Sequence, residues 1–195
     1  MKKYLFGFIT IALISLSTSC SSSNIDVCNV KSMEVFGEKV LKKLESNAIV
    51  SYIEFEKNQN QELRLTTKFA NLIIQYKDSE NKSKVLVYNI AKGSFDVKDA
   101  KIPLMGYGRE ISIQDFVQMS NNVNKAIEEQ KKNNIETVGI GLYKINLSKT
   151  AASDTFTFRL YEEDKSKKNG AWRYYNEYSC FMDGKGNIKD LRPGW

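Results

Sequence analysis

The sequence predicts an α+β fold in which helices pack on one face of an antiparallel sheet and the chain forms two helix-then-strands halves. Two segments carry apolar residues at helical spacing, and each precedes several segments in which apolar and polar residues alternate with a period of two. Short stretches rich in Asn, Asp, Ser and Gly separate these segments, as turns do. The order of elements predicts one α+β domain at residues 31–195, with halves at 31–108 and 109–195.

The first half begins with an amphipathic helix that is expected to start at Ser32 and to stop at Asn47. The apolar residues of this helix are Met33, Phe36, Val40 and Leu44. Alternation then predicts strands at residues 49–55, 63–69, 72–76 and 85–90, with a short extended segment at 95–97. Pro103, Gly106 and Gly108 mark the junction with the second half.

The second half repeats this order. Ser112 and Asp115 have the spacing of a capping pair, so a second helix is expected to begin there and to end at Asn133 and Asn134. Further strands are predicted at residues 137–147, 155–162, 171–182 and 188–191. The lysine-rich residues 163–170 are expected to form a loop, and the glycines at 184 and 186 indicate a tight turn.

The first 19 residues have the order of a secretory signal peptide. A basic start at residues 1–3 is followed by an apolar stretch at 4–16 and by small residues at 17–19. The apolar stretch is shorter than the roughly 20 residues needed to span a bilayer. We therefore expect residues 1–19 to be removed and residues 20–30 to form a polar tether.

Cys20, directly after the small residues, resembles the lipobox cysteine of bacterial lipoproteins, in the looser form common among Bacteroidetes. Leu16 lies one position further from Cys20 than the stricter pattern requires. The resemblance implies that the sulfur of Cys20 carries a diacylglycerol, and that its freed amine takes a third acyl chain such as palmitate, so that the protein is held in a lipid bilayer. Ser21, rather than an acidic residue, favours the outer membrane, facing the periplasm. The alternative is an ordinary signal peptide that happens to end beside a cysteine.

Composition excludes several classes of function. A net charge of +6 with scattered lysines makes nucleic acid a poor partner for an exported protein. The chain has no histidine, which excludes histidine metal sites and imidazole catalysis. Two cysteines besides Cys20 are too few for a common structural zinc site. We therefore expect neither a metal nor a cofactor.

Cys28 and Cys180 allow two interpretations. In an oxidising envelope they are the pair available for a disulfide that joins the end of the tether to the last long strand. Alternatively, Cys180 is a small apolar residue of the core and Cys28 is loose in the tether.

The strand at residues 171–182 is rich in aromatic residues. Alternation places Trp172, Tyr174 and Tyr178 on one face, which is a candidate for partner binding or sugar stacking. Core packing of these rings is the competing interpretation. The acidic runs at 128–129 and 162–164 are interpreted as solvated faces rather than as catalytic pairs.

The order of elements is similar to that of tandem PepSY-like domains and of the β-lactamase inhibitory protein fold, in which each repeat lays one helix on an antiparallel sheet. The resemblance implies a non-catalytic binding or inhibitory role in the cell envelope. A single curved sheet of the cystatin or NTF2-like kind is the alternative fold. The expected function is a membrane-anchored binding, inhibitory or immunity protein whose partner is an envelope protein or glycan. The alternatives are a glycan or peptidoglycan hydrolase that uses two carboxylates, and a structural envelope-assembly accessory.

Overall fold

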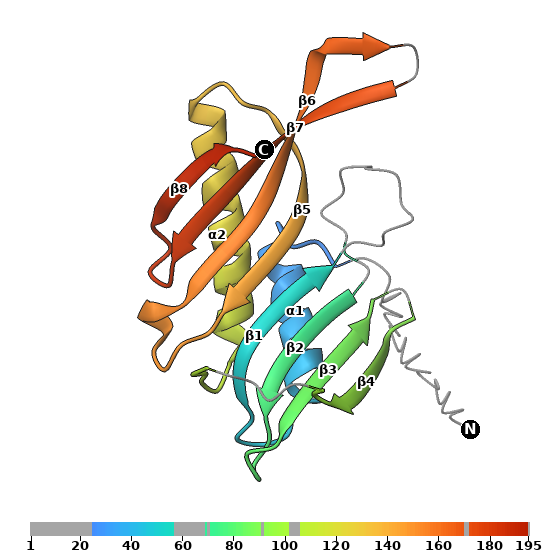
Figure 1. The fold of residues 1–195 in the computed structure, drawn as a ribbon, viewed down its shortest axis with the longest axis vertical. Helices are drawn as coiled ribbons and strands as arrows, with labels where there is room; N and C mark the ends of the chain where they lie inside the picture. The colour runs from blue at the N-terminus through green and yellow to red at the C-terminus, as the bar shows by residue number, and fades with distance from the viewer. Residues whose placement is uncertain are drawn as a thin grey trace, which may run out of the picture.

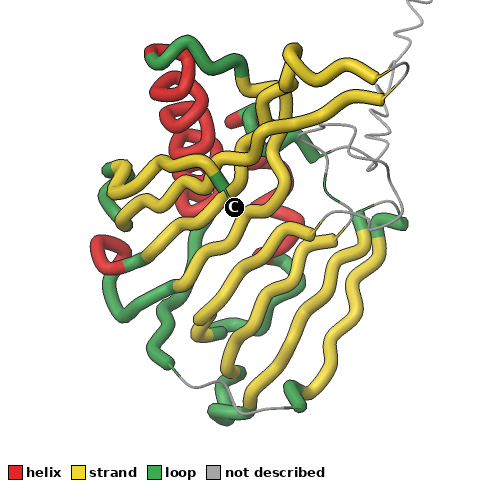
Figure 2. Tube along the Cα trace, turned by 45° about the horizontal axis from the view of Figure 1, so that its top comes forward, coloured by secondary structure: helices red, strands yellow, loops and turns green. Residues whose placement is uncertain are grey.

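A computed structural model describes residues 25–56, 69, 71–90, 92–101, 106–169 and 172–194. Its strands form one antiparallel sheet of eight, in the order β4-β3-β2-β1-β5-β6-β7-β8 (Figure 1). Both helices lie behind this sheet in Figure 1, and Figure 2 shows the same arrangement with the helices in red. The signal peptide at residues 1–19 and Cys20 lie outside the described residues.

The elements follow the chain in the order α1 (Val30–Leu41), β1 (Ile49–Glu56), β2 (Asn71–Lys77), β3 (Ser83–Asn89), β4 (Ser94–Asp99), α2 (Ile113–Lys132), β5 (Thr137–Asn146), a 3-10 turn (Ala151–Ser153), β6 (Thr155–Asn169), β7 (Trp172–Asp183) and β8 (Ile188–Pro193). Most begin within a few residues of the predicted starts, because the change from helical to alternating periodicity is clear in the sequence. The strand predicted at 63–69 lies outside the described residues, apart from Phe69.

The core lies between the sheet and the helices. Alternate residues of the strands are buried, and the antiparallel register aligns them in rows such as Ile53, Ile74 and Leu86 on β1, β2 and β3. The ring of Phe36 on α1 connects the layers, since its centroid lies 5.5 Å from that of Tyr88 on β3 and 6.0 Å from that of Phe116 on α2. One core therefore serves both helices.

The predicted fold class is wrong. The chain does not form two helix-then-strands halves of an α+β domain; it is dominated by a single antiparallel sheet, and the two helices of 12 and 20 residues are a minor part of it. β1 pairs with β5 from Tyr52 opposite Asn146 to Phe55 opposite Tyr143, so the sheet runs through the expected boundary. An unpaired β1 would leave its backbone groups at an open sheet edge, and this pairing satisfies them.

The packed part of the chain begins earlier than the sequence indicates. Ile25 and Val27 lie in the predicted tether, but the structure buries both in the core. Asn29 caps α1 by accepting a hydrogen bond from the backbone N–H of Ser32 at 3.0 Å. The sequence does not reveal this because two apolar residues among polar ones form no recognisable period.

Candidate functional site

The residues expected to form a partner-binding face lie in two different environments along β7, one buried and one exposed. Cys180 and Met182, which share that face, are buried, so the C-terminal part of β7 belongs to the core. Tyr178 is half-buried, and its hydroxyl donates a hydrogen bond to Glu162 Oε2 at 3.0 Å. Tyr174 is 43% exposed, and Trp172 takes the strand position opposite Asn169. Core packing therefore explains one part of the strand, while the other part projects from the body.

The projecting part is a two-stranded arm, which consists of residues 163–169 of β6 and 172–175 of β7 (Figure 1). β5 begins at Thr137, opposite Glu162, and so gives β6 no partner beyond that point. On the other side, β8 reaches β7 only as far as the bond from Gly194 N–H to Glu177 O. A ribbon of two strands is marginally stable by itself in water, so contact with a partner would stabilise such an arm.

The arm is basic. Of its residues, 163–169 and 172–175, four are basic and two, Glu163 and Asp164, are acidic. The side chains of Lys165 and Lys167 are 70% and 68% exposed. In the register of the arm, Lys168 lies opposite Arg173. Lys165 and Lys167 form ion pairs with Glu136 and Asp164, each at 3.3 Å.

A polar cleft of about 500 Å³ lies at the base of the arm. It is lined by Asn134, Glu136, Val138, Glu162, Glu163, Asp164, Lys165 and Asn176. A glycoside hydrolase would need one carboxyl with a raised pKa as general acid. Hydrogen bonds from Ser166, assisted by Lys167, lower the pKa of Asp164, which makes this carboxyl unsuited to that role. Among the described residues, no group of three or more carboxylates and thiols is arranged to hold a metal ion.

The second candidate surface is the face of the sheet that carries no helix, which we call the open face (Figure 1). Its side chains are the half-buried residues that alternate with the core. They include Tyr52, Glu54, Ile73, Gln75, Val85, Val87, Lys144, Thr157, Tyr161, Glu177 and Phe181. Register aligns Ile73 with Val87 and Gln75 with Val85, so the part over β2 and β3 is mainly aliphatic.

Charged groups over β1, β5, β6 and β7 of the open face are paired with one another. Glu54 accepts a hydrogen bond from the Tyr52 hydroxyl at 2.6 Å and contacts Lys144 Nζ at 3.1 Å. Burial, and then the bond to Glu54, raise the pKa of Tyr52. On β7, Glu177 accepts a bond from Tyr161 at 3.0 Å and lies 3.3 Å from Arg159 Nε. Pairing of this kind lowers the cost of covering the surface with a partner.

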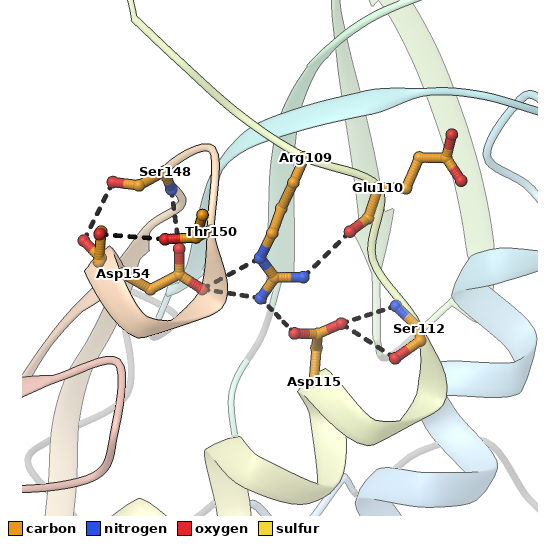
Figure 3. A network of polar contacts seen from close by, with 8 residues as sticks. Arg109, Glu110, Ser112, Asp115, Ser148, Thr150 and Asp154 are labelled. Carbon is orange, nitrogen blue, oxygen red and sulfur yellow. Dashed lines mark hydrogen bonds and ion pairs between the residues drawn. The ribbon is translucent and has the colours of Figure 1, made fainter.

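Figure 3 shows the most concentrated charge cluster of the described residues, around Arg109. Arg109 Nη2 lies 2.7 Å from Oδ2 of Asp154, which is almost fully buried, and it also donates to Asp115. Burial by itself lowers the pKa of Arg109, but its bonds to Asp115 and Asp154 outweigh this effect and raise that pKa. Asp115 also accepts from the backbone N–H of Ser112 at 2.7 Å, which confirms the predicted capping pair.

The Arg109 cluster is structural. Arg109 exchanges two backbone hydrogen bonds with Val50 on β1, and a Cβ at Gly108 would lie 2.4 Å from the Val50 carbonyl oxygen. Asp154 also accepts from the backbone N–H of Ser148 at 2.8 Å. The cluster thus ties the segment before α2 to β1 and to the β5–β6 connection, with its donors and acceptors used internally. The sequence offered no signal for it, because Arg109 and Asp154 are 45 positions apart.

The thiols of Cys28 and Cys180, the pair for which one interpretation allows a disulfide, are unbonded in the structure. Cys180 is buried within the sheet, and Cys28 lies before α1, where its carbonyl oxygen accepts a hydrogen bond from Asn124 Nδ2 at 2.9 Å. Burial, with a smaller contribution from Asp26, raises the pKa of Cys28 to about 11, and burial with Asp190 raises that of Cys180 to about 12. Both thiols are therefore poor nucleophiles.

Across the described parts of the chain, neither helix has the length and apolar character needed to cross a membrane. Comparison with known proteins returned no matching family model, no similar curated protein and no similar solved structure.

Proposed function

We propose that this chain is a lipid-anchored envelope protein that acts by binding another protein, without catalysis, through the open face of its sheet. The observation that carries the proposal is the combination of aliphatic and aromatic side chains with internally paired charges on that face. Surfaces of this composition, with few unpaired charges at their centre, are typical of protein interfaces. The lipobox-like segment that ends at Cys20 supports attachment to the outer membrane.

The size of the open face fits a protein partner better than a small ligand. Eight strands about 4.8 Å apart, each about seven residues long, cover up to about 800 Å². A standard interface buries about 800 Å² on each partner. A glycan-binding site would instead require a concave groove lined with exposed aromatic rings. The cleft at the base of the arm is lined mainly by polar and charged residues and does not have this character.

Site-specific photo-crosslinking tests the proposal. A benzophenone amino acid in place of Tyr52, on the open face, should give an adduct with one protein in intact cells. The same amino acid in place of Val35, which is 38% exposed on α1 behind the sheet, should give none.

A matched pair of variants completes the test. Val87→Lys adds a charge to the aliphatic part of the open face and should abolish the adduct at position 52. Val97→Lys adds the same charge at an exposed position of β4 and should leave it intact. Crosslinks from position 35 alone, or an adduct at position 52 that survives Val87→Lys, would contradict binding through the open face.

The anchor is tested separately. Cys20→Ser removes the acyl acceptor that the lipobox resemblance implies, so the variant should lose incorporation of a clickable fatty acid and leave the membrane fraction. Equal labelling of the wild-type chain and the variant would refute the anchor while leaving the open-face proposal standing.

A further inference from the structure

We propose that two copies of this chain pair through the free edges of their β4 strands, in antiparallel register and with Val97 on the two-fold axis. The sheet of one copy then continues into the sheet of the other. The proposal assigns an interaction surface, the free edge of β4, and a partner, a second copy of this chain. It is independent of the open-face and anchor proposals above, because β4 pairs through backbone groups at the edge of the sheet.

The free backbone groups of β4 follow from its pairing with β3. β4 is the outermost strand on one side of the sheet and pairs with β3 in unbroken register (Figure 1). The Ala100 N–H donates to the Ser83 carbonyl oxygen at 2.9 Å, so these two positions form a hydrogen-bonded pair. Such pairs alternate along an antiparallel ladder, so the N–H and C=O groups of Phe95, Val97 and Asp99 point away from β3. Within the described ranges, these outward groups have no hydrogen-bond partner.

The opposite edge of the sheet is protected in ways that β4 is not. On β8, the bond from Gly194 N–H to Glu177 O places Pro193 at a position whose backbone nitrogen points outward. A proline there cannot donate to a further strand. A bulge also interrupts the pairing of β7 with β8 between Phe181 and Met182. β4 has neither a proline nor a bulge, so its edge is the one open to pairing.

The charges beside Val97 select one register. Asp96 and Lys98 lie opposite Val87 and Val85 of β3, so both charged residues are on the open-face side of the sheet. With Val97 opposite its own copy, Asp96 of each chain faces the partner's Lys98, and opposite charges in that position stabilise a pair of strands. The smallest shift that keeps the free backbone groups facing each other is two residues. It would put Asp96 opposite the partner's Asp96, or Lys98 opposite the partner's Lys98.

The exposed side chains of β4 are compatible with this pairing. Val97 is 47% exposed although it lies opposite the buried Leu86, so the edge of the core is uncovered there. Contact between two copies of Val97 buries this apolar surface. Within one chain, Asp96 and Lys98 form an ion pair at 2.7 Å with both side chains largely exposed, and such a pair contributes little to stability. Exchanging these internal pairs for pairs between the chains therefore sets the register at little cost.

The pairing leaves the rest of the sheet in place. An antiparallel strand pair has its two-fold axis perpendicular to the sheet, so both open faces point to the same side and stay free. Asp99, opposite the partner's Phe95, keeps its ion pair with Lys84 at 2.7 Å. The strands are joined by three hydrogen-bonded positions centred on Val97, each with two bonds between the backbones.

Crosslinking through introduced cysteines tests the register in the full-length chain. Val97→Cys places two thiols on the axis, on Cα atoms about 5.5 Å apart, so a short bismaleimide should give a covalent dimer in intact cells. Asp99→Cys, at a more exposed position of the same strand, places the two Cα atoms about 14 Å apart and should give none. The unaltered chain, which retains Cys28 and Cys180, gives the background.

Sedimentation equilibrium on residues 21–195 tests the backbone pairing. That chain lacks Cys20 and the signal peptide but contains every residue of the hydrophobic core, which begins at Ile25. It should show a reversible equilibrium between monomer and dimer. Val97→Pro removes an N–H that points away from β3, so it should raise the dimer Kd about tenfold or more and leave the pairing with β3 intact. Val97→Thr keeps the N–H and the branched shape, and should change the Kd less than about threefold.

A charge swap tests the register without touching the backbone. Asp96→Lys puts two lysines opposite each other on both sides of the axis and should raise the Kd about fivefold or more. Combining Asp96→Lys with Lys98→Asp restores opposite charges across the interface, so the double variant should return to within about threefold of the unaltered chain. Melting temperatures would establish that these variants are folded.

Four outcomes would overturn the proposal: a chain that stays monomeric, equal Kd values for Val97→Pro and Val97→Thr, no rescue by the charge swap, or equal crosslinking from positions 97 and 99. A β4 edge that instead binds another protein would give the first of these. Val97→Lys, the control for the open face, puts like charges on the axis and should lose the dimer while it keeps the adduct at position 52. Failure of one proposal is therefore distinguishable from failure of the other.

Discussion

Arg109 joins segments that are distant in the sequence, and its removal should be costly. Arg109→Met would leave the carboxylate of Asp154 almost fully buried without its cationic partner. Breaking a buried ion pair from one side destabilises a protein by about 3–5 kcal/mol, because the remaining charge is uncompensated. Urea denaturation should therefore show a loss of this size in the free energy of unfolding. Arg192→Met, which removes a pair on the solvent-exposed side of β8, should cost under about 1 kcal/mol. Equal losses for the two variants would contradict the structural role of Arg109.

The thiol of Cys28 provides a second prediction at the residue scale. Its pKa of about 11 means that the thiol stays protonated below that pH, so little thiolate is present at pH 8. Iodoacetamide should then react with Cys28 in the folded chain of residues 21–195 about a hundredfold more slowly than with an unfolded cysteine. Denaturation should expose two thiols to rapid alkylation. An intact mass lower by two hydrogens before reduction would show a disulfide instead.

Packing between elements depends on Gly37, where α1 meets α2. A Cβ at this position would lie 2.7 Å from Cδ2 of Phe116 and 3.1 Å from its Cβ, so the ring cannot move aside freely. Gly37→Ala gains up to about 1 kcal/mol in helix propensity, whereas overpacking costs about 1–3 kcal/mol. We expect a net loss of about 1 kcal/mol in thermal or urea unfolding. Glu38→Ala, at the next and exposed position, should change stability by less than about 0.5 kcal/mol. Stabilisation by Gly37→Ala would show that the helices can separate there.

Periodicity in the sequence predicts elements that have a buried face and misses elements that are exposed on both faces. The helical spacing of Met33, Phe36 and Val40 predicted α1, because the buried side of a surface helix repeats every three to four residues, but the helix ends at Leu41 and not at the predicted Asn47. Residues 163–170 were expected to form a loop, yet β6 continues to Asn169. A lysine-rich stretch without apolar alternation has no buried side, so nothing in its pattern distinguishes an exposed ribbon from a turn. The sequence therefore did not predict the β6 half of the arm, although it did predict the aromatic strand that forms the other half.

For the whole molecule, the sequence predicted antiparallel strands but not how they join. Ile53 and Phe55 alternate as expected for a strand with one buried face, and that pattern is the same whether β1 is an edge strand or a central one. The pairing of β1 with β5 depends on contacts between residues about 90 positions apart, such as Phe55 with Tyr143 at a ring distance of 5.9 Å. The candidate site was missed for the same reason, because the open face exists only once this sheet is assembled.

A continuous sheet with one core should unfold as one unit. Leu86 is buried on β3, which lies four strands away from β6 in the sheet, so the two strands do not touch. Leu86→Ala should lower the free energy of unfolding by about 2–5 kcal/mol, as removal of a buried leucine side chain does. Cooperative unfolding across the junction of β1 and β5 would transmit this loss to β6. Native-state hydrogen exchange should then show the same loss of protection for the amides of Phe158 and Leu160 on β6 as for the amides of β3. Val97, an exposed residue of the first half, serves as the control. Val97→Ala should leave the amide protection of both strands unchanged. Protection of β6 that survives Leu86→Ala would mean that residues 31–108 and 109–195 unfold separately in spite of the shared sheet.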